Sequence, residues 1–239
     1  MKILYYAYFF IVAAPLLLVS TIITALLTAC GSILFGDRWW GYYPAHLWSR
    51  IFCALSLVSV EVRGREHISP DKNYIFVANH QGAYDIFSIY GYLGHTFRWM
   101  MKKSLEKIPL VGYACRKAGH IFVDMSGSSG VRHTMTDAEK ELRTGMSLCI
   151  FPEGSRTYTG EVGRFKRGAF LLSQEFGLPI VPITIDGAFQ VMPRTAKLPR
   201  PGRIVLTIHQ PVAPPQNDDD MARLMRETRE VVANSMSRK

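Results

Sequence analysis

The chain has 239 residues, enough for one substantial hydrophobic core but short for several domains. Its 28 Lys and Arg outnumber 19 Asp and Glu, which gives a formal net charge of +9. A basic surface is typical of proteins that bind nucleic acid, anionic lipid or an acidic carrier. No nucleic-acid-binding motif is visible in the sequence, whereas a membrane segment is. We therefore expect membrane lipids as partners and no nucleic acid.

The N-terminal region is apolar, and residues 3–36 include no charged side chain. A helix needs only about 20 residues to cross the hydrocarbon core of a bilayer. Pro15 lies inside the run, which therefore predicts either one tilted transmembrane helix or two shorter helices that enter one leaflet. The aromatic cluster at residues 37–43 has the composition of a membrane–water interface. A second apolar stretch, residues 51–60, is expected to pack beside the first.

Residues 27–30, Leu-Thr-Ala-Cys, formally match a bacterial lipoprotein cleavage box. The apolar stretch before them is long for a signal sequence, and residues 31–35 stay apolar instead of continuing into a polar tether. We interpret this match as accidental.

A histidine follows the first buried strand of the chain. Residues 74–78 are apolar and rich in Ile, Val and aromatics, which predicts the strand, and a helix is predicted from about residue 86. His80 therefore falls between a strand and a helix, a usual place for chemistry in α/β proteins. Asp85 can accept the Nδ1–H of the imidazole and leave Nε2 free as a base. Taken alone, such a pair is more often a cap or a core hydrogen bond.

A second predicted strand, residues 147–151, leads directly into a turn. Pro152 ends the strand because it has no N–H to donate, and Gly154 permits a tight turn. Glu153 and Arg156 are then left at the mouth of this strand.

These two segments resemble the glycerolipid acyltransferases, specifically the bacterial 1-acylglycerol-3-phosphate acyltransferases. His80 with Asp85 matches the first sequence block of that family, and Phe-Pro-Glu-Gly-Ser-Arg at residues 151–156 matches the third. Residues 103–124, with Lys-Ser-Leu, Ile-Pro and Gly-His-Ile-Phe-Val-Asp, resemble the second block. Ile-Val-Pro-Ile at residues 180–183 resembles the fourth. The four blocks occur in the family's order.

The second block departs from the family at its end. Where the family usually has an arginine after Ile-Phe-Val-Asp, this chain has Met125. In the resemblance that arginine belongs to the acceptor-phosphate region, so the change concerns the acceptor and not the acyl transfer at His80. Arg116, Lys117 and Arg132 are nearby cations that can substitute.

The resemblance implies an O-acyltransferase that moves an acyl group from acyl-CoA or acyl-ACP to the sn-2 hydroxyl of lysophosphatidic acid. His80 would be the general base and Asp85 would orient it. Backbone N–H groups near Gly82 would stabilise the oxyanion. The implied substrate-binding residues are Lys103, Glu153, Gly154 and Arg156.

Each substrate-binding residue has a distinct expected role. Arg156 can hold a phosphate with two parallel hydrogen bonds, and Lys103 can add a point charge. Glu153 would orient Arg156 or an acceptor hydroxyl, with a purely structural role in the turn as the alternative. No metal and no cofactor are implied, because the acceptor hydroxyl attacks the thioester directly.

Two other functions stay open. The protein can be an acyltransferase of the same family that acts on another lysolipid, such as a lyso-aminolipid, which Met125 favours. It can also be a catalytically silent membrane lipid-binding protein, although the presence of both His80 and Asp85 argues against that. We expect a location at the bacterial inner membrane, with the catalytic domain on the cytoplasmic side.

The remaining candidate residues show no chemical pattern. The cysteines Cys30, Cys53, Cys115 and Cys149 have no paired spacing, so we expect free thiols, not a disulfide framework or a zinc site. His120 is either a substrate contact or a hydrogen-bonded structural residue, and the second is the more common case.

The predicted fold class is α/β, because strands alternate with helices. The resemblance implies a single αβ sandwich of glycerolipid-acyltransferase type with an N-terminal membrane-embedded helical segment. The expected division is a membrane-anchoring segment at residues 1–60 and a catalytic domain at 61–239. The basic stretch 194–203 is either a loop that contacts anionic headgroups or a plain solvated loop. Helices are predicted at 137–142, 168–176 and 221–235, and strands at 178–185 and 203–209.

Overall fold

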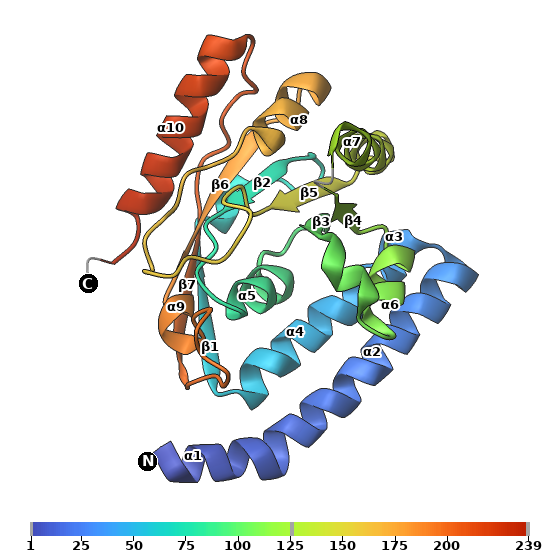
Figure 1. The fold of residues 1–239 in the computed structure, drawn as a ribbon, viewed down its shortest axis with the longest axis vertical. Coiled ribbons are helices and arrows are strands. Elements are labelled where there is room, and N and C mark those ends of the chain that lie inside the picture. Colours follow the sequence, from blue (N-terminus) through green and yellow to red (C-terminus); the bar gives the residue numbers. More distant parts are fainter. Residues whose placement is uncertain (1, 125–126, 238–239) are drawn as a thin grey trace.

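A seven-stranded sheet forms the centre of the computed structural model, which describes residues 2–124 and 127–237. The strand order is β1-β7-β6-β2-β5-β3-β4, and every neighbouring pair is parallel except β6 and β7. Figure 1 shows helices on both faces of this sheet, as predicted. The strands are β1 (Val58–Arg63), β2 (Ile75–Ala78), β3 (Phe97–Lys102), β4 (Ile121–Val123), β5 (Ser147–Ile150), β6 (Ile180–Asp186) and β7 (Gly202–Ile208).

The two helical layers follow from the alternation of side chains along the strands. Phe76 and Ala78 of β2 point into a core shared with α4 and α5, whereas Ile75 and Val77 point into a core shared with α7, α8 and α10. The helices are α1 (Lys2–Tyr8), α2 (Ala14–Phe35), α3 (Asp37–Trp40), α4 (Tyr43–Leu55), α5 (Tyr84–Tyr92), α6 (Val111–Lys117), α7 (Gly127–Arg143), α8 (Gly168–Phe176), α9 (Ala188–Val191) and α10 (Asp218–Asn234), with a π-helical turn η1 (Phe9–Ala13) and 3₁₀ turns η2 (Arg65–His67) and η3 (Lys103–Lys107).

The N-terminal apolar run is one bent helix. The helix α1, the turn η1 and the helix α2 follow one another without a break over Lys2–Phe35. Within the described residues, this is the one helix that is long and apolar enough to cross a membrane. A π-helical turn and Pro15, which cannot donate to the preceding turn, account for the bend visible in Figure 1.

This bent helix buries one side and exposes the other. Ala25 and Ala29 pack closely against Ala114 of α6, because small side chains let helices approach. Near its start, the helix packs against Phe52 and Leu55 of α4, as expected for the apolar stretch 51–60. Large apolar side chains project from the remaining surface: Ile3, Leu4, Phe10, Ile11, Leu18, Ile33, Leu34 and Phe35.

Several predicted elements are confirmed and others need correction. Strands β2, β5, β6 and β7 and helix α8 lie where the sequence placed them, within two residues. Helix α7 starts at Gly127, ten residues before the predicted 137. Helix α10 starts at Asp218, because the side chain of Asn217 accepts a hydrogen bond from the Asp220 N–H and caps it. The three aspartates thus form the first helical turn, where the helix dipole favours negative charge.

Candidate active site

The first and third family blocks meet at one edge of the sheet. Strands β6, β2, β5 and β3 are parallel neighbours, so their carboxyl ends lie at the same edge. His80 follows β2, Glu153 follows β5 and Lys103 follows β3. Neighbouring strands lie about 4.8 Å apart, so β2 and β5 bring His80 and Glu153 together, and Lys103 starts two strands away from His80.

The predicted contact between His80 and Asp85 is present. Nδ1 of the imidazole lies 2.7 Å from Oδ2 of the fully buried Asp85. The carboxylate can only accept here, since Oδ2 also accepts from the backbone N–H groups of Gln81 at 2.6 Å and Gly82 at 2.9 Å. The proton of a neutral His80 therefore sits on Nδ1, which leaves a lone pair on Nε2.

The oxyanion role expected for the backbone near Gly82 is wrong for this arrangement. The N–H groups of Gln81 and Gly82 both donate to Asp85, and the N–H of Ala83 donates to the carbonyl of Met192 at 3.1 Å. These three donors hold the turn and the carboxylate in place. They are not directed at a developing charge on a substrate.

An aromatic stack fixes the plane of the imidazole. The ring of Phe151 lies 4.0 Å from that of His80, centroid to centroid, with an angle of 7° between the planes. Trp99 stacks on the other side of Phe151 at 5.3 Å. From the sequence, Phe151 is only the last residue of a strand. Its contact with His80 depends on the pairing of β2 with β5.

Glu153 supports the backbone of the histidine. Its Oε1 accepts from the His80 N–H at 2.8 Å and its Oε2 accepts from the Gly163 N–H at 2.9 Å. Burial raises the pKa of this carboxyl group, and the two backbone donors act in the opposite direction. Both oxygens are engaged by backbone, so the geometry favours the structural alternative over a contact with Arg156.

A residue near the C-terminus completes this support. Arg229 of α10 donates from Nε to the carbonyl of Gly163 at 2.9 Å and from Nη2 to that of Val162 at 2.7 Å. A Cβ at Gly163 would lie 2.7 Å from Glu153 Oε2, so a larger residue here would displace the Glu153 carboxylate. No motif in the sequence links Arg229 to His80, and only the fold connects them.

The turn after β5 has the predicted form. Gly154 has a φ of +75°, and its N–H donates to the carbonyl of Phe151 at 3.0 Å. The N–H of Thr157 donates to the His80 carbonyl at 2.9 Å, which keeps the half-buried Arg156 beside the histidine. Among residues 2–124 and 127–237, no carboxylate forms an ion pair with Arg156.

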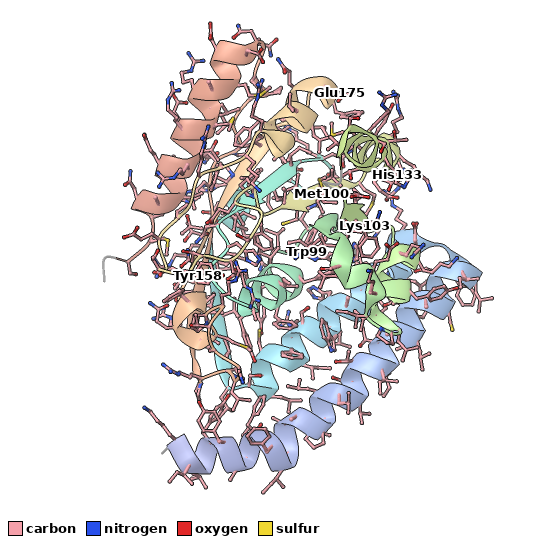
Figure 2. The ribbon with its side chains drawn as sticks, in the orientation of Figure 1. Trp99, Met100, Lys103, His133, Tyr158 and Glu175 are labelled. Carbon is pink, nitrogen blue, oxygen red and sulfur yellow. The ribbon has the colours of Figure 1, made fainter. Side chains whose placement is uncertain are left out.

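Lys103 lies in a different place from the other predicted residues. Its ammonium pairs with Asp124, and this hydrogen bond raises the pKa of Lys103. Both line a cleft of about 520 Å³, which neither His80 nor Arg156 lines. Figure 2 shows Lys103 and His133 on the side of the sheet near α6 and α7. The cleft walls also include Asp37, Glu106, Arg116, Lys117, Asp137, Lys140 and Glu141.

Met125, at the family's arginine position, lies outside the described residues. Of the three cations suggested as substitutes, Arg116 and Lys117 line the cleft beside Lys103, and Arg116 pairs with Glu106. Arg132 contributes instead to a smaller hollow on α7.

Comparisons with known proteins identify the family to which the chain belongs. A family model described as Acyltransferase matches residues 59–186, more than half of the chain. The chain belongs to this acyltransferase family. The resemblance carried by the four sequence blocks is thereby confirmed, and so is the prediction that the protein is a transferase.

The relatives of this acyltransferase include proteins from algae, plants and animals. A Chlamydomonas reinhardtii protein named 1-acyl-sn-glycerol-3-phosphate acyltransferase is 29% identical, over 98% of this chain and 69% of its own length. A chloroplastic protein of Brassica napus with the same enzyme name is 28% identical, over 92% of this chain and 64% of its own length. The chain thus spans about two thirds of these curated relatives.

A solved structure extends the similarity to the whole fold. The crystal structure of the 1-acyl-sn-glycerophosphate (LPA) acyltransferase PlsC from Thermotoga maritima superposes with a TM-score of 0.79 at 27% identity. The match covers 97% of this chain and 93% of the other. The predicted mixed α/β architecture with its apolar N-terminal helix is confirmed.

His120 of this acyltransferase is hydrogen-bonded within the fold, which favours the structural role, and it also lines the cleft beside Lys103. It is buried, and its Nδ1 accepts from the Trp99 N–H at 3.3 Å while Nε2 lies 3.2 Å from the Tyr90 hydroxyl. Burial, helped by the positive charge of Arg98, lowers the pKa of His120 to about 3. The imidazole is therefore neutral near physiological pH.

The cysteines are free thiols. Cys53 and Cys149 are buried, Cys115 is partly buried and Cys30 is exposed. Burial raises the pKa of Cys149 well above its usual value, so this side chain is a thiol and a poor nucleophile. Across the part of the chain that the structure describes, no three His, Cys, Asp or Glu side chains are grouped so as to hold a metal ion.

Proposed function

We propose that this acyltransferase moves an acyl group from acyl-CoA or acyl-ACP to the sn-2 hydroxyl of 1-acylglycerol-3-phosphate, which gives phosphatidic acid. The 2.7 Å contact between His80 Nδ1 and Asp85 Oδ2, at the edge where the first and third family blocks meet, carries this proposal. The names of the relatives point to lysophosphatidate as the acceptor. The acyl carrier is a thioester in either case, so the chemistry at His80 is the same.

The proposed reaction needs one base. Nε2 of His80 removes the proton of the acceptor hydroxyl while its oxygen attacks the thioester carbonyl carbon. Asp85 stabilises the imidazolium that forms, and the fixed ring plane keeps Nε2 directed at the hydroxyl. When the carbon–sulfur bond breaks, the thiolate leaves and takes up the proton from the imidazolium. Because the alcohol attacks directly, no protein nucleophile is needed.

The acceptor phosphate is assigned to Arg156. Its backbone adjoins Thr157, whose N–H donates to the His80 carbonyl at 2.9 Å, and arginine can bind a phosphate through two parallel hydrogen bonds. Lys103 remains in the proposal as a second, more distant cation, since it leaves β3 at the same edge of the sheet. Gly154 and Glu153 contribute by shaping the turn that carries Arg156.

A membrane location belongs to the same proposal. We assign the bent N-terminal helix to membrane anchoring and the sheet with its covering helices to catalysis, at the bacterial inner membrane with the catalytic domain facing the cytoplasm, where acyl thioesters are available. The expected boundary between residues 1–60 and 61–239 falls inside β1, which pairs with β7, and α4 also packs in the core of the sheet. The exposed apolar side of α2 supports this assignment. Leu198 packs against the cluster of Phe9, Ala13 and Leu17, so the basic stretch 194–203 lies beside the start of the helix.

Point substitutions test the anchor without removing the packed side of the helix. Ile11→Glu and Leu18→Glu change side chains that are 75% and 64% exposed, and each should reduce flotation with vesicles containing anionic phospholipid. Val231→Glu, on the exposed side of α10, is the matched control and should float normally. Normal flotation of all three variants would place the anchor elsewhere.

Product analysis tests the activity. Purified protein is incubated with acyl-CoA or acyl-ACP and with lysophosphatidate, monoacylglycerol or a lyso-aminolipid, and products are identified by mass spectrometry. We expect phosphatidate that disappears in His80→Ala. A product from the lyso-aminolipid alone would replace the proposed acceptor. Binding of lipids without any product would support the silent lipid-binding alternative.

A further inference from the structure

Two segments far apart in the sequence are hydrogen-bonded to the turn that carries His80. On one side, the Thr157 N–H donates to the His80 carbonyl at 2.9 Å. On the other side, the Ala83 N–H donates to the Met192 carbonyl at 3.1 Å, and Gly82 pairs with Pro193 in a β-bridge. Residues 156–158 and 192–194 are therefore both fixed to the same turn.

The approach of the second segment is close. A Cβ at Gly82 would lie 2.6 Å from the carbonyl oxygens of both Ala188 and Met192, so only glycine fits at this point. The backbone of residues 192–194 consequently cannot move far from the His80 turn while the turn keeps its shape. A side chain on this segment has a defined position relative to the base.

Arg194 connects the two segments. Its guanidinium carbon lies 4.4 Å from the centre of the Tyr158 ring, and Nη1 lies 3.5 Å from the carbonyl oxygen of Arg156. Figure 2 labels Tyr158 near α9, on the opposite side of the view from Lys103. The Tyr158 side chain is 65% exposed, so the ring holds the guanidinium at the rim of the site without burying it.

The positive charge at this rim has no carboxylate partner among the residues that the structure describes. Arg156 and Arg194 form no ion pair with a carboxylate in the described ranges. The nearest carboxyl group of the turn, Glu153, already accepts from two backbone N–H groups. Two arginines on adjoining segments favour a bound anion, and guanidinium groups match the geometry of phosphate oxygens.

Building on the proposed function, we propose that Arg194, oriented by Tyr158, is a second phosphate-binding residue next to His80. With Arg156 it forms the two-arginine site. Phosphate occurs in both proposed substrates, as the phosphomonoester of the acceptor and as the phosphates attached to the pantetheine of the donor. The chemistry recognised is the same, and substrate pairs that differ in phosphate separate the two sources.

Steady-state kinetics of the full-length protein in detergent micelles provides the test. Acyl-CoA is paired with phosphate-free S-acyl-N-acetylcysteamine, and lysophosphatidate with 1-monoacylglycerol. Arg194→Ala should lower kcat/KM roughly tenfold for the phosphate-bearing member of one pair and leave its phosphate-free partner unaffected. The pair that responds identifies the bound substrate. Lys197→Ala, an exposed cation in the same stretch, is the matched control and should behave as wild type.

Variants of the tyrosine test how Arg194 is held. Tyr158→Ala removes the ring under the guanidinium and should reproduce part of the loss, again only with the phosphate-bearing substrate. Tyr158→Phe keeps the ring and should retain the wild-type preference. Equal losses in both variants would overturn the proposed role of the ring, and equal loss with all four substrates would overturn the phosphate contact.

Direct binding separates this inference from the proposed function. Isothermal titration calorimetry with CoA and with micellar lysophosphatidate measures the affinity of the protein for each probe, whether or not turnover occurs. Weaker binding of either probe to Arg194→Ala supports the two-arginine site, even if the wild-type protein formed no phosphatidate. Unchanged binding of both probes would overturn the site, even if the wild-type protein were an active lysophosphatidate acyltransferase.

Discussion

Around His80, the polar groups that position the imidazole are held by hydrogen bonds, whereas the exposed Arg194 at the rim lies against the ring of Tyr158. Asp85 is fully buried and accepts from the imidazole and two backbone N–H groups. Arg194, by contrast, lies against the ring of Tyr158 and makes a long contact with the carbonyl oxygen of Arg156. Both regions sit at the carboxyl edge of β2 and β5.

This difference in how firmly the base and the rim arginine are held matches two demands of acyl transfer. A general base works only when it is held close to its reacting geometry, so its supports must be rigid. A phosphate can be attracted by charge over a longer distance and with more varied orientations. Changes at the His80 turn should therefore lower kcat, and changes at the rim should mainly raise KM.

The largest effect is expected from His80→Ala. Loss of the base should reduce kcat by about 10⁴-fold, the upper end of what general-base catalysis contributes. Circular dichroism and vesicle flotation should match the wild type, because the His80 side chain is partly exposed and lies at the edge of the core. Substantial turnover by a folded His80→Ala protein would contradict the assignment of the base.

Asp85→Asn should come next. An amide cannot stabilise the imidazolium, and its NH₂ group would face the donors of Gln81 and Gly82 if the oxygen turned to His80. We expect kcat to fall by about 10²- to 10³-fold with a nearly constant acceptor KM. A rise in KM without a fall in kcat would move Asp85 from orientation of the base to substrate binding.

Arg156→Ala should raise the acceptor KM by about 10- to 100-fold with little change in kcat. The reason is the loss of two charge-assisted hydrogen bonds to phosphate. Arg156→Lys should recover only part of the affinity, since lysine keeps the charge but lacks the planar fork. An unchanged lysophosphatidate reaction in Arg156→Ala would exclude this side chain from phosphate binding.

Arg229→Gln tests the long-range support of the base. Losing the charged donors to Val162 and Gly163 should lower the free energy of unfolding by about 1–3 kcal/mol, measured by urea denaturation. We also expect a several-fold lower kcat with unchanged KM. Arg223→Ala, an exposed arginine on the same helix, is the control. Equal effects in both variants would indicate helix destabilisation alone.

The smallest effect on activity is expected from protonation of His120, which changes the free energy of unfolding. Its pKa is about 3 when folded and near 6.5 when exposed, so the unfolded chain binds the extra proton between these values. The folded protein therefore loses stability as the pH falls from about 6.5 toward 3. His120→Asn should flatten this part of the pH profile of unfolding. A profile identical to wild type would show that other groups control acid stability.

Local spacing was enough to predict the His80–Asp85 contact. Five residues separate them, and a strand followed by a helical turn brings the carboxylate back to the imidazole. The turn at Gly154 could also be predicted from neighbouring residues alone. The role of Glu153 depends on the fold, because its partners are the N–H groups of His80 and Gly163, and their positions depend on the pairing of β2 with β5.

By itself the sequence determined the strand–turn–helix order, the apolar N-terminal helix and the four family blocks, because each depends on residues that are near neighbours in the chain. Only the tertiary structure decided that Phe151 stacks on His80, that Arg229 supports Glu153 through Gly163, and that Lys103 pairs with Asp124 away from the base. Those contacts join separate strands and helices. Their geometry follows from the order and register of the sheet, which side-chain patterns within one segment do not specify.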